Sequence, residues 1–252
     1  MSTNIQKVGV CGAGGTMGAG IAIVASRAGF ETACFDTSME VLDRARSQTE
    51  GFFGKSVDRG KMATTDRDAA LARLSASTDM GALADCDLVI EAVFEDLGVK
   101  RELLGALDGI CKPEALFASN TSTLSITEIA AGCDRQDRVV GMHFCLPAQL
   151  MKLIEMSPGV NTSDEAFADA WAWTEAAGQQ PVATQDKPGF ILNALLVPFN
   201  NDAIRAVEAI DAIETDIDKP VMTSNQAMVW HALRKLGIDD RPTGYGRLMG
   251  AD

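Results

Sequence analysis

The sequence is short of positive charge. Its 252 residues carry 35 acidic and 22 basic side chains, which gives a formal net charge of −13. A surface this acidic repels nucleic acids and anionic membranes, so we expect neither as a partner. An anionic ligand would therefore need a local positive site, which helix N-termini and backbone N–H groups can supply.

The sequence also lacks close cysteine pairs and long apolar runs, and we expect no leader segment. No two of the six cysteines form a CxxC pair, and Cys11, Cys34 and Cys145 fall in apolar, strand-like runs. Free thiols packed as small hydrophobic groups suit a reducing compartment. The N-terminus enters the first strand at once, and no apolar run is long enough to span a bilayer. We therefore expect a cytoplasmic protein.

Strand-like and helix-like segments alternate up to residue 186. The expected strands cover residues 6–11, 31–36, 86–95, 115–120, 137–144, 151–157 and 181–186, and the expected helices cover 17–29, 39–60, 66–74, 97–110, 124–133 and 163–178. Alternating strands and helices joined by short loops are typical of a parallel sheet covered by helices. We predict an α/β fold with a Rossmann-type, doubly wound, mostly parallel sheet in residues 1–186.

The pattern changes beyond Pro188, where we find no convincing strand. Residues 190–210 instead show a broad apolar face at helical spacing, and residues 214–237 indicate further helix, broken at Pro220. We therefore predict a small all-α C-terminal domain over residues 187–252.

A glycine-rich turn follows the first strand, in the stretch VGVCGAGGTMGAGIA at residues 8–22. Such a turn places backbone N–H groups and the positive end of a helix against a pyrophosphate. The turn holds one residue more than the usual Gly-x-Gly-x-x-Gly, and a tight turn without a ligand is the alternative. The candidate cofactor-binding residues are Gly12, Gly14, Gly15, Thr16, Met17 and Gly18.

Asp36 closes the second expected strand, 18 residues past Gly18. An acid at this place can hold the ribose hydroxyls of an adenosine. Thr37 and Ser38 follow, with no adjacent arginine for a 2′-phosphate, so NAD is favoured over NADP. Asp36 could also cap the next helix, and a cap and a ribose contact can coexist.

The chain has only two histidines, His143 and His231. Imidazole titrates near neutrality, so a histidine can act as a general base or a general acid. His143 ends a strand-like segment, which is where ligands meet an open α/β sheet. Glu155 follows on the next such segment, and its carboxylate would orient the imidazole. We expect no function for His231, which lies in the tail.

Five motifs, in combination and in this order, resemble the 3-hydroxyacyl-CoA dehydrogenase family, close to its bacterial 3-hydroxybutyryl-CoA dehydrogenases. They are GAGGTMGAGIA, DLVIEAVFEDLGVKRELL, ASNTSTL, GMHFCLPAQLMKLIE and DKPGFILNALLVPFNNDAIR. The spacings are similar to those of the family, with 21 residues from Ser122 to His143, 12 from His143 to Glu155 and 38 from Glu155 to Asn193. The resemblance covers roughly residues 5–218.

The resemblance implies an oxidoreductase that moves a hydride between NAD and the C3 position of a short-chain 3-hydroxyacyl-CoA or 3-oxoacyl-CoA. It implies that His143 is the general base in oxidation and the general acid in reduction. Glu155 would pair with His143, while Ser122 and Asn193 would hydrogen-bond the substrate. No metal ion is expected, and a homodimer would form through the helical domain.

The resemblance also implies further binding residues. Glu95, Lys100 and Ser122 would contact NAD, although Glu95 and Lys100 could equally be a solvated pair. Lys55 and Arg59 would lie on a basic helix face that meets the CoA. Basic residues are also common at the C-terminal end of a helix, so this second explanation stays open.

Three departures from the family pattern leave two alternative functions open. One glycine is inserted in the turn, Leu146 stands where the family has an asparagine that contacts the nicotinamide, and the resemblance fails after Asp218, where the chain ends short. One alternative is the same reaction on an acyl-carrier-protein-bound or other 3-hydroxy acid. The other is a catalytically impaired nucleotide-binding protein of the same fold.

Overall fold

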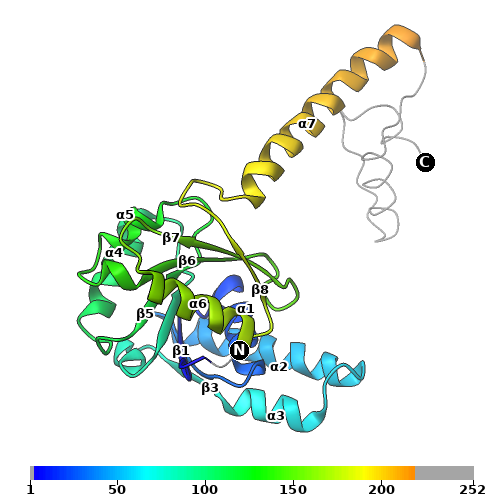
Figure 1. The fold of residues 1–252 in the computed structure, drawn as a ribbon. Helices are drawn as coiled ribbons and strands as arrows, with labels where there is room; N and C mark the ends of the chain where they lie inside the picture. The colour runs from blue at the N-terminus through cyan, green and yellow to red at the C-terminus, as the bar shows by residue number, and fades with distance from the viewer. Residues whose placement is uncertain (1–2, 219–252) are drawn as a thin grey trace. The chain divides into compact units, whose positions relative to one another are not determined.

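The computed structural model describes residues 3–218 and divides the chain into two compact units, Met1–Ile191 and Leu192–Asp252 (Figure 1). The first unit holds one eight-stranded sheet in the order β3-β2-β1-β4-β5-β6-β7-β8. Every neighbouring pair is parallel except β6 and β7, which run antiparallel. The predicted doubly wound, mostly parallel sheet is confirmed.

The strands are short, and all except the two edge strands β3 and β8 have buried middles, as expected for a sheet covered on both faces. Their bounds are β1 Lys7–Cys11, β2 Glu31–Phe35, β3 Leu74–Ser77, β4 Leu88–Glu91, β5 Leu116–Ser119, β6 Val139–Phe144, β7 Leu153–Pro158 and β8 Gln180–Ala183.

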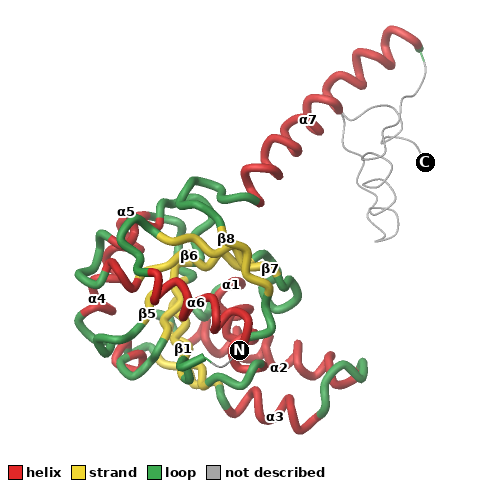
Figure 2. The backbone as a smooth tube through the Cα atoms, viewed as in Figure 1, coloured by secondary structure: helices red, strands yellow, loops and turns green. Residues whose placement is uncertain are grey.

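Helices cover both faces of the sheet (Figure 2). Apolar side chains of α1 and α6 pack with one face into one core cluster, and those of α4 and α5 pack with the other face into a second. The helices of the first unit are α1 Thr16–Arg27, α2 Met39–Asp58, α3 Thr64–Ala72, α4 Leu97–Asp108, α5 Ile126–Ala130 and α6 Asp164–Ala176, with short 3₁₀ turns η1 Met80–Leu83 and η2 Gln136–Arg138.

The expected helix over residues 66–74 is wrong at its end. α3 stops at Ala72, and Leu74–Ser77 form β3, a strand that sequence analysis did not predict. β3 is an edge strand whose residues are all at least partly exposed, so it has no buried apolar run. It forms because β2 offers it a parallel partner from Thr32 to Phe35.

The second unit begins with α7, Leu192–Ile217, the helix expected over residues 190–210. The segment from 187 to 191, which we assigned to the helical domain, falls in the first unit instead. The Ile191 N–H donates to Glu155, and Asp186, just before the segment, accepts a hydrogen bond from the Ile126 N–H. These two bonds hold the segment against the rest of the sheet unit. The further helix expected over residues 214–237 lies mostly outside the described residues, as does His231. No helix of the described residues is long and apolar enough to cross a membrane.

Candidate active site

The parallel pairing of β1, β4, β5 and β6 brings the carboxyl ends of these strands to one edge of the sheet. The glycine turn follows β1, the Glu95 loop follows β4, the Ser122 loop follows β5, and His143 lies near the end of β6. Ligands of open α/β sheets bind along this edge. Residues that are far apart in the sequence therefore meet at one candidate site.

His143 and Glu155 form a buried pair because of strand register. The two residues lie directly opposite each other in the antiparallel β6–β7 ladder. Their side chains meet with 2.8 Å between His143 Nδ1 and Glu155 Oε2, and both residues are buried. A carboxylate can only accept a hydrogen bond, so this contact places a proton on Nδ1 and leaves Nε2 for a ligand. Such a pair can take up and return a proton at a fixed place.

The glycine turn is shaped for close approach to a ligand. Gly12 has φ +76°, and a Cβ on Gly18 would lie 2.2 Å from the carbonyl oxygen of Gly12. The N-cap of α1 is Gly15, which offers no side-chain cap, and the first turn holds no acidic residue. The N–H groups of Thr16 and Met17 have no acceptor within the helix and point outward from its positive end. The turn therefore fits a pyrophosphate despite the additional glycine.

Asp36 is connected to this turn. It directly follows β2, and its Oδ2 accepts a hydrogen bond of 3.0 Å from the Gly14 N–H. The other carboxylate oxygen accepts a bond of 2.8 Å from the Thr37 N–H. The carboxylate thus lies beside the pyrophosphate turn, where it can receive ribose hydroxyls. The cap of α2 is Ser38, so Asp36 is not the N-cap residue of that helix.

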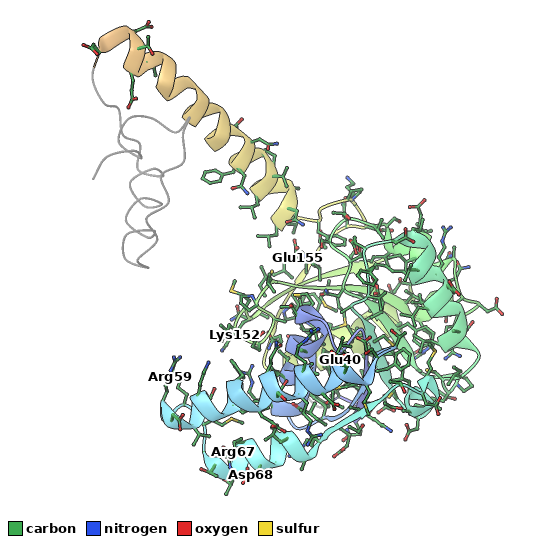
Figure 3. All side chains as sticks on the ribbon, turned by 180° about the vertical axis from the view of Figure 1, so that it is seen from behind. Glu40, Arg59, Arg67, Asp68, Lys152 and Glu155 are labelled. Carbon is green, nitrogen blue, oxygen red and sulfur yellow. The ribbon has the colours of Figure 1, made fainter. Side chains whose placement is uncertain are left out.

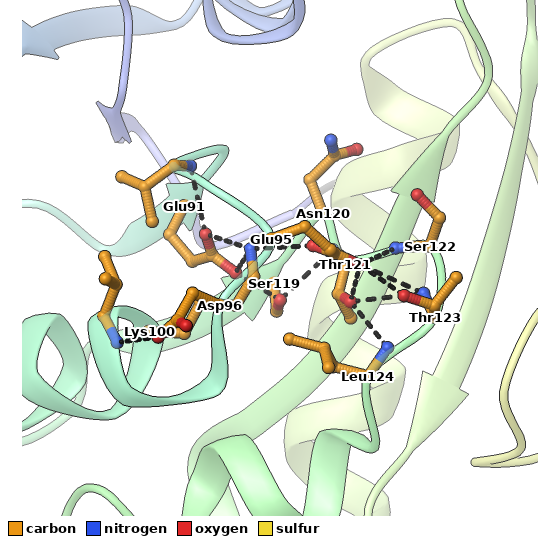
Figure 4. A network of polar contacts seen from close by, with 12 residues as sticks. Glu91, Glu95, Asp96, Lys100, Ser119, Asn120, Thr121, Ser122, Thr123 and Leu124 are labelled. Atoms are coloured by element: carbon orange, nitrogen blue, oxygen red, sulfur yellow. Dashed lines mark hydrogen bonds and ion pairs between the residues drawn. The ribbon is translucent and has the colours of Figure 1, made fainter.

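Glu95 organises the loop that carries Ser122 (Figure 4). Its Oε1 accepts hydrogen bonds from the Ser122 N–H at 2.9 Å and from the Thr123 N–H at 3.1 Å. The hydroxyl groups of Thr121 and Thr123 donate to the same oxygen. Burial alone would raise the pKa of the Glu95 carboxyl, but the hydrogen bond from Thr121 and the charge of Lys100 outweigh burial and lower it. Glu95 therefore remains an anion that holds Ser122 in place.

Lys100 lies in the interior, so the alternative of a solvated pair with Glu95 is wrong. Only 1% of its side chain is exposed, and its Nζ lies 2.9 Å from both carboxylate oxygens of Glu91. The same Nζ lies 3.3 Å from Glu95 Oε2, and the Ser119 hydroxyl also donates to Glu91. Lys100 thus supports the Ser122 loop through its ion pair with Glu95 (Figure 4). Its expected contact with NAD stays a prediction that this burial does not favour.

Lys55 and Arg59 line a cavity of about 710 Å³ at the C-terminal ends of α1 and α2. Three further basic side chains line the same cavity, and Asp66 is the acidic residue among its lining. Arg59 lies at the far end of α2 in Figure 3. The cavity also contains Leu150, from the loop that follows His143. The basic lining residues are Arg27, Lys55, Arg59, Lys61 and Arg73.

Asn193 lies in the first turn of α7, in the second unit, so its place relative to His143 stays a prediction.

Leu146 is on the loop after β6, and 64% of it is exposed. An exposed apolar side chain there has no hydrogen-bonding group for a nicotinamide amide.

Sequence reasoning missed several residues that build the site. Asn120 accepts a hydrogen bond of 2.9 Å from the Phe144 N–H and so joins the Ser122 loop to the end of β6. Glu91 ends β4 as a charged residue in an apolar strand, which was a visible signal of a buried partner. Asp186 and Phe190 lie in the quoted DKPGF motif, but nothing in their spacing indicated contacts with α5 and His143.

Comparisons with known proteins agree with this geometry. Residues 7–187 match the family model described as the 3-hydroxyacyl-CoA dehydrogenase, NAD binding domain. The chain belongs to the 3-hydroxyacyl-CoA dehydrogenase family. The matched NAD binding domain includes the glycine turn and Asp36, and the geometry of these residues fits the cofactor.

Sequence similarity to individual proteins extends beyond the NAD-binding domain. A 3-hydroxybutyryl-CoA dehydrogenase of Mycobacterium tuberculosis is 41% identical over 242 residues, which cover 95% of this chain and 83% of the relative. A probable 3-hydroxybutyryl-CoA dehydrogenase of Deinococcus radiodurans is 41% identical over 215 residues, covering 82% of this chain and 77% of the relative.

Solved structures of the 3-hydroxyacyl-CoA dehydrogenase family also superpose well. The crystal structure of 3-hydroxybutyryl-CoA dehydrogenase from Escherichia coli K12 has a TM-score of 0.79 at 42% identity, and the match covers 82% of this chain and 43% of that one. The (S)-3-hydroxybutyryl-CoA dehydrogenase from Ralstonia eutropha has a TM-score of 0.77 at 36% identity, covering 79% and 70% of the two chains.

Proposed function

We propose that the protein is an NAD-dependent dehydrogenase that interconverts a short-chain 3-hydroxyacyl-CoA and the corresponding 3-oxoacyl-CoA. The observation that carries this proposal is the His143–Glu155 pair, buried at the carboxyl edge of the sheet beside a loop that presents Ser122. The names of the relatives agree with a 3-hydroxybutyryl-CoA substrate. A cytoplasmic location and a homodimer formed through the helical unit are part of the same proposal.

The chemistry divides between NAD and the chain. The glycine turn and Asp36 would hold NAD, which would supply the hydride acceptor in oxidation and, in its reduced form, the hydride donor in reduction. In oxidation the free Nε2 of His143 takes the proton of the C3 hydroxyl, and the Glu155 carboxylate stabilises the resulting imidazolium through Nδ1–H. In reduction His143 gives that proton to the C3 oxygen. Ser122 and Asn193 hydrogen-bond the substrate, and the Glu95 carboxylate holds the Ser122 backbone in place through the Ser122 N–H.

The direct test is acetoacetyl-CoA reduction. Wild-type protein with NADH and acetoacetyl-CoA should oxidise NADH in step with the appearance of 3-hydroxybutyryl-CoA, measured by absorbance and mass spectrometry. NADPH should serve poorly because Asp36 and the absence of a neighbouring arginine disfavour a 2′-phosphate. If NADH binds but no thioester is reduced, the impaired nucleotide-binding alternative is supported and the proposal fails.

The basic cavity favours CoA over a carrier protein. Five cations around one acid form a local positive site in a chain of net charge −13, and CoA carries phosphates that need such a site. Burial lowers the pKa of Arg27, as expected for a guanidinium removed from water. Leu150, on the loop between β6 and β7, lines this cavity, and we expect the pantetheine arm to follow that loop toward His143.

Replacing two of the cavity's basic residues tests whether the acyl group is carried by CoA or by an acyl carrier protein. The variant Lys55→Ala/Arg59→Ala should raise the KM for acetoacetyl-CoA by about 10-fold and leave the KM for acetoacetyl-N-acetylcysteamine, which has no phosphate, within about two-fold. Arg67→Ala is the matched control, because Arg67 is a cation on α3 that does not line the cavity. An unchanged KM for acetoacetyl-CoA in the double variant would favour an acyl-carrier-protein-bound substrate.

A further inference from the structure

One carboxylate holds both the imidazole and the segment that leads to the helical unit. Glu155 Oε2 lies 2.8 Å from His143 Nδ1, while Glu155 Oε1 accepts a hydrogen bond of 2.8 Å from the Ile191 N–H. Only 2% of Glu155 is exposed, so water does not compete for these oxygens. The carboxylate that orients His143 is therefore also bonded to the segment that ends at Ile191.

Phe190 packs directly against the imidazole. Its ring centroid lies 5.6 Å from that of His143, with the planes tilted by 39°, and the residue is buried. Phe190 has φ +48°, a left-handed conformation that is unfavourable for a residue with a side chain. Hydrogen bonds on both sides maintain it, from the Phe190 N–H to the Lys187 carbonyl and from Ile191 to Glu155. The strained backbone therefore serves to place the ring on His143.

The other end of this segment is anchored as well. Asp186 accepts hydrogen bonds from the backbone N–H groups of Ile126 and Thr127, at 2.7 and 2.9 Å, and from the hydroxyls of Ser125 and Thr127. Residues 186–191 are thus bonded at one end to the start of α5 and at the other to the acid–base pair. The second unit begins at the next residue, Leu192.

We propose that Phe190 and the Ile191 amide are positioning groups for His143, so that the segment joining the two units fixes the imidazole for proton transfer. The proposal rests on the proposed function for its chemistry. The Phe190 ring limits rotation of the imidazole, and the Ile191 N–H holds Glu155 so that Oε2 stays on Nδ1. The proton then stays on Nδ1, and Nε2 faces the substrate.

The test replaces Phe190 and follows both turnover and the state of His143. Phe190→Gly removes the ring and relieves the φ of +48°, so the variant should fold. We expect kcat for acetoacetyl-CoA reduction, per NADH-binding site, to fall by about 10-fold or more, with the KM for NADH within about two-fold. Phe190→Leu keeps an apolar cover over His143 and should recover most of kcat.

The matched control is Phe30→Ala. Phe30 is buried to a similar degree and packs on Trp173 with ring centroids 5.7 Å apart, in a core cluster that does not contain Phe190. Its loss should lower stability and leave kcat per NADH-binding site unchanged. Equal kcat in Phe190→Gly and wild type would overturn the proposal, as would equal losses of kcat in Phe190→Gly and Phe30→Ala.

A second measurement separates this proposal from the proposed function. The imidazole ¹⁵N signals of only two histidines need assignment, and a His143 variant identifies them. Wild type should show His143 with its proton fixed on Nδ1, and Phe190→Gly should show exchange between the two nitrogens. This result can be read even if wild type reduces no thioester, an outcome that contradicts the proposed function alone. An unchanged His143 spectrum in Phe190→Gly would refute the positioning role.

Discussion

Asp36 makes one observed contact with the glycine turn, and we propose a second contact with the cofactor at the same place. Its carboxylate accepts a hydrogen bond from the Gly14 N–H and thereby helps to shape the turn that would receive the pyrophosphate. In the proposed complex the same carboxylate receives the adenosine ribose hydroxyls. NAD binding should therefore depend on Asp36 through both a direct contact and the shape of the turn, whereas NADP binding depends on the turn alone.

Replacing Asp36 should separate these contributions. Asp36→Ala should weaken NADH binding by about 10-fold or more and NADPH binding by less, because only NADH offers a free ribose 2′-hydroxyl to the carboxylate. Fluorescence titration of both cofactors measures the two losses. Asp36→Asn, which keeps an acceptor for Gly14, is the control for the turn. Equal losses for the two cofactors in Asp36→Ala would remove the ribose argument.

At the level of elements, a buried ion pair joins the end of β4 to α4. Glu91 and Lys100 are both 1% exposed in their side chains, and Lys100 also approaches Glu95. Removal of one partner leaves an uncompensated buried charge, whereas removal of both does not. The pair also carries the loop that presents Ser122, so its loss should affect the site as well as the fold.

Single and double variants test this pair. Lys100→Met should lower the free energy of unfolding by about 3–5 kcal/mol, and Glu91→Gln/Lys100→Met should lower it by less. Urea denaturation measures both. A single variant within about 1 kcal/mol of wild type would show that water or another cation already compensates Glu91.

The elements also show which parts of the fold could be predicted from sequence. β1, β4 and β6 are apolar runs buried in the sheet, so their pattern alone identifies them. β3 could not be found, because Leu74–Ser77 is partly exposed and becomes a strand only through its pairing with β2. α3 was therefore predicted to extend too far.

Some residues of the candidate site could be predicted from the sequence, and others could not. The chemistry of His143 and Glu155 was visible from residue type and spacing, and strand register brings the two residues together. The place of Lys100 was not visible, because a lysine on a helix that begins with an exposed turn gives no sign of a buried carboxylate beneath it. Asp186 and Phe190 were unrecognised for a similar reason, since their partners lie about 40 to 60 residues away in the sequence.

At the scale of the whole molecule, anionic carboxylates stabilise the folded sheet unit. For Asp186, burial would raise the pKa, but hydrogen bonds from Thr127, Ile126 and Ser125 outweigh burial and lower it below the ordinary value of 3.8. A carboxyl with a lowered folded-state pKa contributes stability that is complete above its unfolded-state value. The contribution is lost as the pH falls through the lower, folded-state pKa.

The difference in unfolding free energy between Asp186→Asn and wild type should therefore become smaller in acid. The loss in unfolding free energy caused by the substitution should be largest above about pH 5 and should shrink as the pH falls below 3.8. Urea denaturation at a series of pH values measures this difference. Asp43→Asn, at an exposed position on α2, is a control that should show little dependence on pH. A loss that is constant from pH 7 to about pH 3 would contradict the anionic role of Asp186.

In the proposed reaction His143 exchanges a proton with the substrate, and bound NAD would supply the hydride chemistry. The most direct measurement is acetoacetyl-CoA reduction by wild type and His143→Ala, with NADH binding measured on the same samples by fluorescence. We predict that kcat falls by about 10²-fold to 10⁴-fold in His143→Ala, with the Kd for NADH within about three-fold of wild type. Turnover that survives the substitution, or NADH binding that is lost with it, would contradict the role assigned to His143.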